Sequence, residues 1–267
     1  MHIEFVKNTL DDLTKSGRFD PENHTLLSIC ADPRDAKMFH DFGLKKVTLS
    51  NLTRVEDRAN ETDEYGFNWK FIDAQDITLE DDSYDFVFVS AGLHHCKWPH
   101  RAVAEMYRVA KKGIIIFEAR DSHLMRFGQT IGLVKEFELN PTLRKTLEFG
   151  GLNGGEVPNF VYRWTEKEFE KTIRSMDPTL DQEYRYYYDY RLNPRRIPSS
   201  VRFIANWAIK IVKAIFRRQG NSFGMVALIP DDIETATFPW LSRNADRTVS
   251  LNKPYVEALP KGGRGRV

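Results

Sequence analysis

The sequence has few cysteines and no long uninterrupted hydrophobic run. Two of its 267 residues are cysteine, Cys30 and Cys96, which is too few for a disulfide scaffold and is typical of a reducing compartment. The longest apolar stretch, residues 201–216, is interrupted by three basic residues and falls short of the roughly 20 residues that a bilayer span requires. Residues 1–12 lack the apolar core of a secretion signal. We therefore expect a cytoplasmic protein.

An excess of either charge is also missing. Lys and Arg number 39, Asp and Glu number 38, the formal net charge is +1, and 41% of the residues are hydrophobic. This composition indicates a globular protein with enough chain for a sizeable core, and it argues against disorder. Residues 191–220 differ, because they contain eight Lys or Arg and no acid. A local basic block in a near-neutral chain indicates one specialised surface and no nucleic-acid partner.

Short apolar segments alternate with helix signals over the first 120 residues. Asp32 is a typical N-cap, Pro33 suits the first helical position and Gly43 marks a helix end, so a helix is predicted over 33–42. Another is predicted over 99–110. Strands are predicted from apolar runs over 25–31, 45–52, 69–75, 84–92 and 113–119. Alternation at this spacing predicts a parallel sheet with helices on both faces.

The second half of the chain has a different pattern. Residues 121–160 are predicted to be helical and then loop-like around their glycines. Thr165 and Glu168 form a capping box that opens a further helix. The remaining predictions are strands over 183–192 and 222–230, an amphipathic helix over 199–218 between them, and an irregular tail over 231–267.

Polar residues follow the predicted strands in a fixed order along the chain. The segments that carry this order are LLSICADPRD at 26–35, VTLSN at 47–51, FIDAQDI at 71–77, DDSYDFVFVSAGLHHC at 81–96 and EMYRVAKKGIIIFEA at 105–119. The series resembles the class I S-adenosylmethionine-dependent methyltransferases, in their broad small-molecule branch, over about residues 25–120. The resemblance implies an α/β, Rossmann-like, doubly wound fold with a seven-stranded, mostly parallel sheet and an inserted helix between the last two strands.

The resemblance also implies a domain organisation and a cofactor. Residues 1–230 would form a single methyltransferase-like domain, in which 120–165 and 193–220 are insertions on the acceptor side or in a cap. Residues 231–267 would be the irregular tail. The cofactor that the resemblance implies is S-adenosylmethionine.

The expected cofactor site lies at the carboxyl ends of the strands, where doubly wound sheets bind their ligands. Asn51 stands at the family's ribose position, and Asp73 stands where the family hydrogen-bonds the adenine amino group. The implied cofactor-binding residues are Cys30, Ala31, Asp32, Arg34, Asn51, Asp73, Ala74 and Ser90. The alternatives are a turn-forming role for Asn51 and Asp73 and a helix cap for Asp32.

The first loop lacks every glycine that the family usually has there. Ser28, Cys30, Asp32 and Arg34 occupy those places. Glycine leaves room for the cofactor and permits a positive φ, so other residues can replace it only if the backbone keeps a negative φ and the side chains turn away. Arg34 either pairs with the cofactor carboxylate or is a solvated residue of the first helical turn.

His94 and His95 follow the fourth predicted strand, at the mouth of the expected cleft. A neutral imidazole there can take a proton from an attacking hydroxyl, so both are candidate catalytic bases. The alternative is a structural pair that hydrogen-bonds nearby backbone. We expect no metal site, because adjacent histidines on an extended segment face opposite ways and no carboxylate spacing completes one. Glu118 and Arg120 end the fifth strand and either line an acceptor pocket or form a salt link.

These features predict a methyltransferase that uses S-adenosylmethionine to O-methylate a small or glycan-like acceptor. The glycine-free loop motivates an alternative, a methyltransferase fold that binds or assembles without catalysis. A dinucleotide oxidoreductase is disfavoured because Gly-x-Gly-x-x-Gly is absent. The tyrosines of 183–192 either pack a helix on the sheet or form an aromatic wall for a sugar or ring. The helix over 199–218 either covers the fold or contacts an anionic membrane surface or a lipid-linked acceptor, at the inner face of a membrane.

Overall fold

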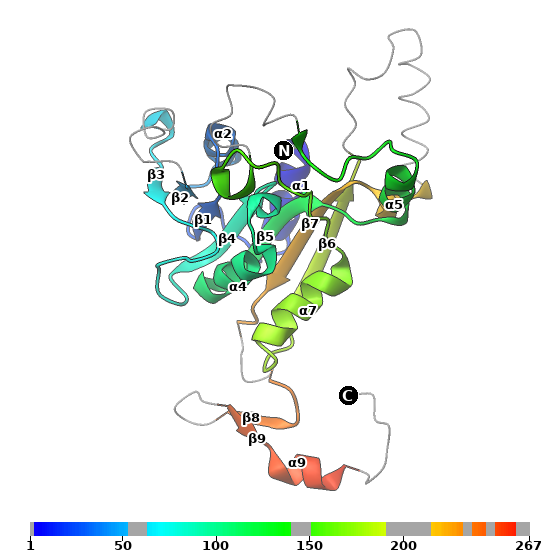
Figure 1. The fold of residues 1–267 in the computed structure, drawn as a ribbon. Coiled ribbons are helices and arrows are strands. Elements are labelled where there is room, and N and C mark those ends of the chain that lie inside the picture. The colour runs from blue at the N-terminus through cyan, green and yellow to red at the C-terminus, as the bar shows by residue number, and fades with distance from the viewer. Residues whose placement is uncertain are drawn as a thin grey trace.

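The computed structural model describes residues 3–52, 63–139, 151–190, 215–231, 237–243 and 249–259. Its main feature is a seven-stranded sheet with the order β3-β2-β1-β4-β5-β7-β6 (Figure 1). The strands are β1 Thr25–Ile29, β2 Lys46–Asn51, β3 Asn68–Phe71, β4 Tyr84–Ser90, β5 Ala110–Ala119, β6 Glu183–Asp189, β7 Ser222–Leu228, β8 Leu241–Arg243 and β9 Val249–Leu251. The α-helices are α1 Ile3–Lys15, α2 Pro33–Phe42, α4 Pro99–Val109, α5 His123–Thr130, α7 Glu166–Met176 and α9 Lys253–Ala258, and the short 3-10 helices are η1 Asp63–Tyr65, η2 Leu93–His95, η3 Leu152–Gly154 and η6 Arg217–Gln219.

The strand pairing confirms the predicted doubly wound α/β fold. Neighbouring strands from β3 to β5 are parallel, whereas β7 is antiparallel to both β5 and β6. The strand order changes direction between β1 and β4, because the chain moves outward to β3 and then returns to β4 on the other side of β1. The helix predicted over 199–218 falls mainly in residues 191–214, which lie outside the described part of the chain.

Helices cover both faces of the sheet because its central strands are apolar on both faces. In β4, Phe86 and Phe88 belong to the hydrophobic cluster that includes α1 and α2. The alternate residues Val87 and Val89 belong to the cluster that includes α4 and α7. Figure 1 shows these two pairs of helices on opposite sides of the strands. The carboxyl ends of the parallel strands hold the loops described below.

Helices α1 and α5 differ from the sequence predictions. Helix α1 was not predicted, although it buries Phe5, Val6, Leu10 and Leu13 at helical spacing. The helix predicted to begin at 121 is short, because α5 ends at Thr130 and is followed by a glycine with φ 73°.

The tail is not irregular throughout. Strands β8 and β9 pair with each other, and α9 follows them (Figure 1). The side chain of Asn252 accepts the N–H of Tyr255 and so caps α9, while the Asn252 N–H donates to the carbonyl of Trp240. These short elements depend on local caps and carry no hydrophobic periodicity, which explains why the prediction missed β8, β9 and α9.

No helix in the described part of the chain is both long enough and apolar enough to cross a membrane.

Candidate active site

Two cavities lie at the carboxyl ends of the parallel strands. Cavity A has a volume of about 240 Å³ and is lined by residues that follow β1, β2, β3 and β4. Cavity B has a volume of about 230 Å³ and is lined by the end of β5 together with residues of α1, α5, β7 and the loop before α7. Ser90 and Ala91, at the end of β4, line both cavities. The two cavities therefore share a wall.

Cavity A contains most of the predicted cofactor residues. Seven of the eight line it, namely Cys30, Asp32, Arg34, Asn51, Asp73, Ala74 and Ser90. The eighth, Ala31, is buried outside the lining, and its carbonyl accepts Asn51 Nδ2–H at 2.8 Å. Asn51 Oδ1 accepts the N–H of Leu52 at 2.7 Å. Each amide atom of Asn51 keeps one further hydrogen-bonding position, because Nδ2 has two protons and Oδ1 two lone pairs.

Cys30 holds the first loop in the left-handed conformation, with φ 52°. The condition of a negative φ is not met at this position, because the loop keeps a backbone conformation that glycine usually provides and places a cysteine on it. Room for the Cys30 side chain comes from Gly92, where an added Cβ would lie 2.4 Å from Cys30 Cβ. A glycine is thus found after β4, the strand that pairs with β1, and it makes room for the side chain in the first loop.

The start of α2 forms the polar rim of cavity A. Asp32 accepts the N–H of Arg34 at 2.7 Å, and Asp35 accepts the N–H of Asp32 at 2.9 Å, which completes a capping box. The Arg34 guanidinium pairs with the same Asp32 carboxylate, and 71% of the Arg34 side chain is exposed. Burial, and then the negative charge of Asp32, raise the pKa of Asp35 to about 7.

Asp73 and Ala74 lie in the turn after β3. Asp73 Oδ1 accepts the backbone N–H of Gln75 at 2.8 Å. The Gln75 side chain in turn accepts the N–H of Trp98 at 2.9 Å and donates to Asn153 Oδ1 at 3.2 Å. Gln75 and Asn153 also line cavity A and were not predicted from the sequence. Gln75 stands two residues after a candidate ligand, whereas Asn153 comes from a distant loop and had no recognisable motif.

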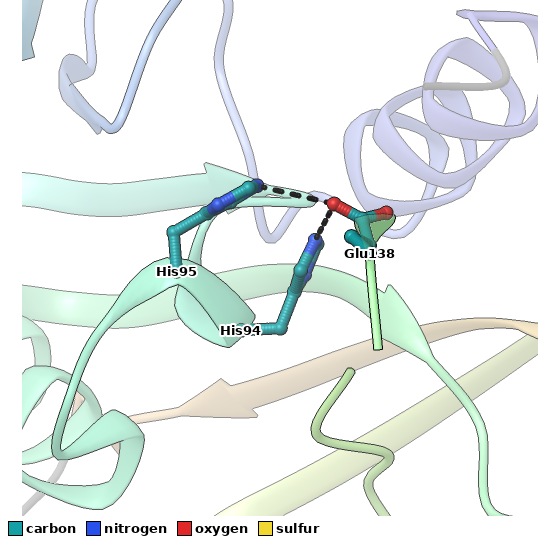
Figure 2. Close-up of side chains that lie close together, drawn as sticks. All are labelled: His94, His95 and Glu138. Atoms are coloured by element: carbon teal, nitrogen blue, oxygen red, sulfur yellow. Dashed lines mark ion pairs between the residues drawn. The ribbon is translucent and has the colours of Figure 1, made fainter. Parts of the chain in front are cut away.

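His94 and His95 lie on the 3-10 helix η2, not on an extended segment. Their ring centroids are 4.4 Å apart, and both rings face Glu138, which follows α5 in the chain (Figure 2). Glu138 Oε2 lies 3.8 Å from Nε2 of His94 and 3.9 Å from Nε2 of His95. The expected opposite orientation of the rings is therefore wrong. Consecutive side chains of a 3-10 helix point about 120° apart, whereas those of a strand point to opposite faces. The expectation that no carboxylate completes the group is also wrong.

Glu118, near the end of β5, is the buried partner of η2. Its side chain is 0% exposed, Oε1 accepts the N–H of Leu93 at 2.6 Å, and Oε2 lies 2.7 Å from Nδ1 of His94. Glu118 and His94 both line cavity B, whereas His95 lines cavity A. The two alternatives for Glu118 therefore hold together, because it lines a cavity and forms a salt link.

The charges around η2 distinguish its two histidines. Burial alone would lower the pKa of His94, but the carboxylates of Glu118 and Glu138 outweigh it and raise that pKa to about 10. Burial, and then the positive charge of His94, lower the pKa of His95. The contact with His94 lowers the pKa of Glu138. At neutral pH, His94 is thus a cation between two carboxylates, and His95 is neutral.

The other predicted candidates have structural positions. Arg120 donates to Glu166 at 2.6 Å and lies 4.7 Å from the ring centroid of Tyr188. Tyr186 and Tyr188 stack on Phe223. No tyrosine of β6 is among the residues that line cavities A and B. These tyrosines therefore form no aromatic wall of cavity A or B, and the packing alternative describes Tyr186 and Tyr188.

Comparison with known proteins agrees with this topology. Residues 36–117 match a family model described as a methyltransferase domain. No curated protein matches the sequence.

Three solved structures share the fold. Magnesium protoporphyrin IX methyltransferase from Synechocystis with bound SAH is 12% identical, with a TM-score of 0.53 over 86% of this chain and 84% of that chain. An S-adenosylmethionine-dependent methyltransferase from Mesorhizobium loti is 11% identical, with a TM-score of 0.51 over 81% of this chain and 96% of that chain. A putative methyltransferase from Bacillus halodurans is 16% identical, with a TM-score of 0.50 over 84% of this chain and 99% of that chain.

The matched segment contains β2, β3, β4 and η2 with Asn51, Asp73, Ser90, His94 and His95. The sheet has the order that the sequence resemblance implied, five parallel strands followed by an antiparallel pair. Residues 36–117 are thus similar to a methyltransferase domain, and the sheet has the fold of the class I S-adenosylmethionine-dependent methyltransferases.

Proposed function

We propose that the chain transfers the methyl group of S-adenosylmethionine to an oxygen atom of a small or glycan-like acceptor. The observation that carries this proposal is the wall shared by the two cavities at Ser90 and Ala91. Cavity A contains the expected cofactor residues, and cavity B contains His94 and Glu118. A cofactor in cavity A and an acceptor in cavity B would meet at this wall.

Cavity A offers the polar groups that a nucleoside with an amino-acid tail needs. We assign Asp73 to the adenine amino group and Asn51 to the ribose hydroxyls, through the hydrogen-bonding positions that Asn51 retains. Asp32 and Arg34, at the start of α2, are assigned to the amino and carboxylate groups of the tail. These assignments follow the order of the strands, because the cofactor would extend from β3 past β2 and β1 to α2.

Methyl transfer first requires that the acceptor oxygen, the methyl carbon and the sulfur atom lie in line. The acceptor oxygen attacks the methyl carbon in line with the carbon–sulfur bond, the new oxygen–carbon bond forms as that bond breaks, and the bonding electrons stay on sulfur. Holding the three atoms in line lowers the free-energy barrier by several kcal/mol. The hydroxyl proton must leave the oxygen and pass to a base, since the neutral product ether has no place for it.

We assign proton removal to His95. Both ring nitrogens of His94 face carboxylates, at 2.7 Å from Glu118 and 3.8 Å from Glu138, so its ring has no free lone pair. His95 lines cavity A beside the shared wall, and its Nε2 lies 3.9 Å from Glu138. A carboxylate at that distance stabilises the imidazolium that forms when His95 takes a proton.

Calorimetry with S-adenosylmethionine and S-adenosylhomocysteine tests cofactor binding. Transfer of a labelled methyl group to panels of hydroxyl, amine and carbon acceptors tests the chemistry. We expect both cofactors to bind and a hydroxyl compound to accept the label. His95→Gln should lower kcat and change the KM for the cofactor much less. Absence of heat and of a thermal shift at millimolar cofactor would overturn the proposal.

A second candidate function is binding or assembly without catalysis. It is favoured by the first loop, where Arg34 and Asp32 pair with each other and the Asn51 amide is tied to backbone. Such a protein would transfer no label to any acceptor. Calorimetry and the transfer assay therefore separate the two candidates.

We also propose that the basic segment around 199–218 contacts an anionic membrane surface or a lipid-linked acceptor. Its described end supports this, since Ile215 and Phe216 are 68% and 53% exposed beside Arg217 and Arg218. Each basic residue near an anionic surface contributes about 1 kcal/mol, which salt weakens. We expect sedimentation with anionic but not neutral vesicles, reduced by salt and by Lys210→Glu/Lys213→Glu. Equal sedimentation in all arms would contradict the contact.

A further inference from the structure

A compact group of three possible metal-ligand atoms lies where the two cavities meet. One ring nitrogen of His94, one ring nitrogen of His95 and a carboxylate oxygen of Glu138 lie within 4.8 Å of one another (Figure 2). We infer that these three side chains bind one divalent transition-metal ion, with Zn²⁺ as the ion that best suits two imidazoles and one carboxylate.

The spacing of the three atoms suits one ion between them. Ligand bonds of about 2.0–2.2 Å in a tetrahedral zinc site place neighbouring ligand atoms about 3.4 Å apart. Glu138 Oε2 lies 3.8 Å and 3.9 Å from the two imidazole nitrogens. The two Glu138 distances would need to shorten by about half an ångström, and the two imidazole nitrogens, which lie within 4.8 Å of each other, would also need to move closer through side-chain rotation. Glu138 and His95 are the ligands able to move, because their side chains are 37% and 30% exposed, whereas that of His94 is 9% exposed.

The surroundings of His94 are those of a metal ligand. Glu118 Oε2 lies 2.7 Å from Nδ1 of His94, and the other oxygen of Glu118 is held by the N–H of Leu93 at 2.6 Å. Histidines that bind metals usually donate their second ring N–H to a carboxylate or carbonyl in this way, which fixes the ring and directs the other nitrogen to the ion. Glu118 has a 0% exposed side chain, so the His94 ring has a fixed direction before any ion binds.

The carboxylates around the group also suit a cation. Glu118 Oε2 lies 2.7 Å from Nδ1 of His94, and Glu138 Oε2 lies 3.8 Å and 3.9 Å from Nε2 of His94 and His95. An ion bound at Nε2 of His94 would leave the Nδ1–H of that ring on Glu118.

Three protein ligands leave the fourth zinc position open, as in catalytic zinc sites. His94 and Glu138 line cavity B, and His95 lines cavity A. An acceptor hydroxyl that enters cavity B can therefore take the open position and lose its proton more readily. This consequence rests on the proposed methyl transfer, and it would make His95 a ligand instead of the base. The binding of the ion itself does not rest on that function.

Cobalt titration tests the site without measuring activity. The full-length chain, without a histidine tag and treated with EDTA, is titrated with Co²⁺ while the visible spectrum is recorded. Zn²⁺ is then added in competition. We expect one Co²⁺ per chain, with the intense absorption of a low-coordinate cobalt site, and its loss when Zn²⁺ displaces the cobalt. A spectrum that stays that of the hydrated ion would overturn the inference.

Matched variants assign the ligands. Glu138→Gln should weaken Co²⁺ binding by more than about tenfold, and Glu118→Gln, which acts only through His94, by about 10–100-fold. Glu136→Gln is the matched control, because it removes an exposed carboxylate two residues away and should leave binding unchanged. Equal affinity in Glu138→Gln and wild type would also overturn the inference. Circular dichroism checks folding, and His95→Gln replaces any variant that unfolds.

Calorimetry of the EDTA-treated protein with S-adenosylhomocysteine separates this inference from the proposed function. Cofactor binding without cobalt binding would remove the metal site and leave the methyltransferase proposal standing. Cobalt binding without cofactor binding would do the reverse.

Discussion

Cavities A and B share a wall but are built in different ways. Cavity A is lined by loops between residues 30 and 96, to which only Asn153 and Gly154 are added from later in the chain. Cavity B takes residues from seven parts of the chain, from Phe5 in α1 to Ser222 in β7. Cavity A is therefore positioned mainly by the strand ends and the start of α2, whereas cavity B depends on several elements packed around the sheet. Under the proposed function, the choice of acceptor could then change through α1, α5 and the loop before α7 while cavity A stays the same.

The buried carboxyl groups of the two cavities also differ. Glu118 in cavity B faces a protonated histidine at 2.7 Å, whereas Asp35 in cavity A is 5% exposed and accepts the backbone N–H of Asp32. Burial raises the pKa of Asp35 to about 7. A carboxyl group with a folded-state pKa above its ordinary value binds a proton more tightly in the folded state, so the stability it contributes is present at low pH and is lost as the pH rises through about 7.

The largest effect we predict is therefore the pH dependence that Asp35 causes. Between pH 4 and 7 the free energy of unfolding of the wild type should fall by about 2–4 kcal/mol relative to Asp35→Asn, which stays neutral and can still accept the Asp32 N–H. Urea unfolding at several pH values measures the difference. Asp41→Asn, at the exposed end of α2, should behave as wild type. Parallel curves for wild type and Asp35→Asn would show that cavity A carries no such buried acid.

The next effect concerns cofactor binding to cavity A. Asp73→Ala should weaken S-adenosylhomocysteine binding by about 1.5–3 kcal/mol, the range for a hydrogen bond to a charged group. Cobalt binding beside cavity B should be unchanged, because Asp73 contacts none of the three inferred ligands. Calorimetry measures both, with Asp76→Ala as the control, since the Asp76 side chain is 73% exposed. Unchanged cofactor affinity in a folded Asp73→Ala protein would contradict the adenine assignment.

The difference between the cavities also explains what could be predicted from the sequence. Asn51 ends β2 and Asp73 lies two residues after β3, and strand ends are recognisable from local patterns. Glu138 contacts η2 only because the segment after α5 packs against it, a long-range contact without a motif. The orientation of His94 and His95 was predicted wrongly because a strand was assumed to continue where a 3-10 turn begins.

The conformation of Cys30 shows a further limit of local reasoning. The space for its side chain depends on Gly92, which is 62 positions later in the printed sequence. A missing glycine in one loop is compensated by a glycine in another, and only the folded sheet places the two together.

The third prediction tests this compensation. Gly92→Ala should cost about 1–3 kcal/mol of stability through overpacking, because the new Cβ would lie 2.4 Å from Cys30 Cβ and 3.0 Å from Val89 Cγ2. Adding Cys30→Gly should recover most of that loss, since it removes the closest contact and glycine favours a positive φ. Chemical unfolding of the two single variants and the double variant gives the coupling energy. Additive losses would show that the two positions do not compensate.

The smallest effect we predict is that of Arg34, at the solvent edge of cavity A. Its guanidinium already pairs with Asp32, and its side chain is 71% exposed, so its contact with a cofactor carboxylate is worth only about 0.5–1 kcal/mol. Arg34→Ala should therefore weaken S-adenosylhomocysteine binding about two- to fivefold, while adenosine, which has no amino-acid tail, binds as before. Arg34→Lys keeps the charge without the fork of donors and should fall in between. Calorimetry with both ligands at low and high salt measures the effect. An equal loss for S-adenosylhomocysteine and adenosine would mean that the substitution acts through the Asp32 cap of α2 and not through a contact with the cofactor carboxylate.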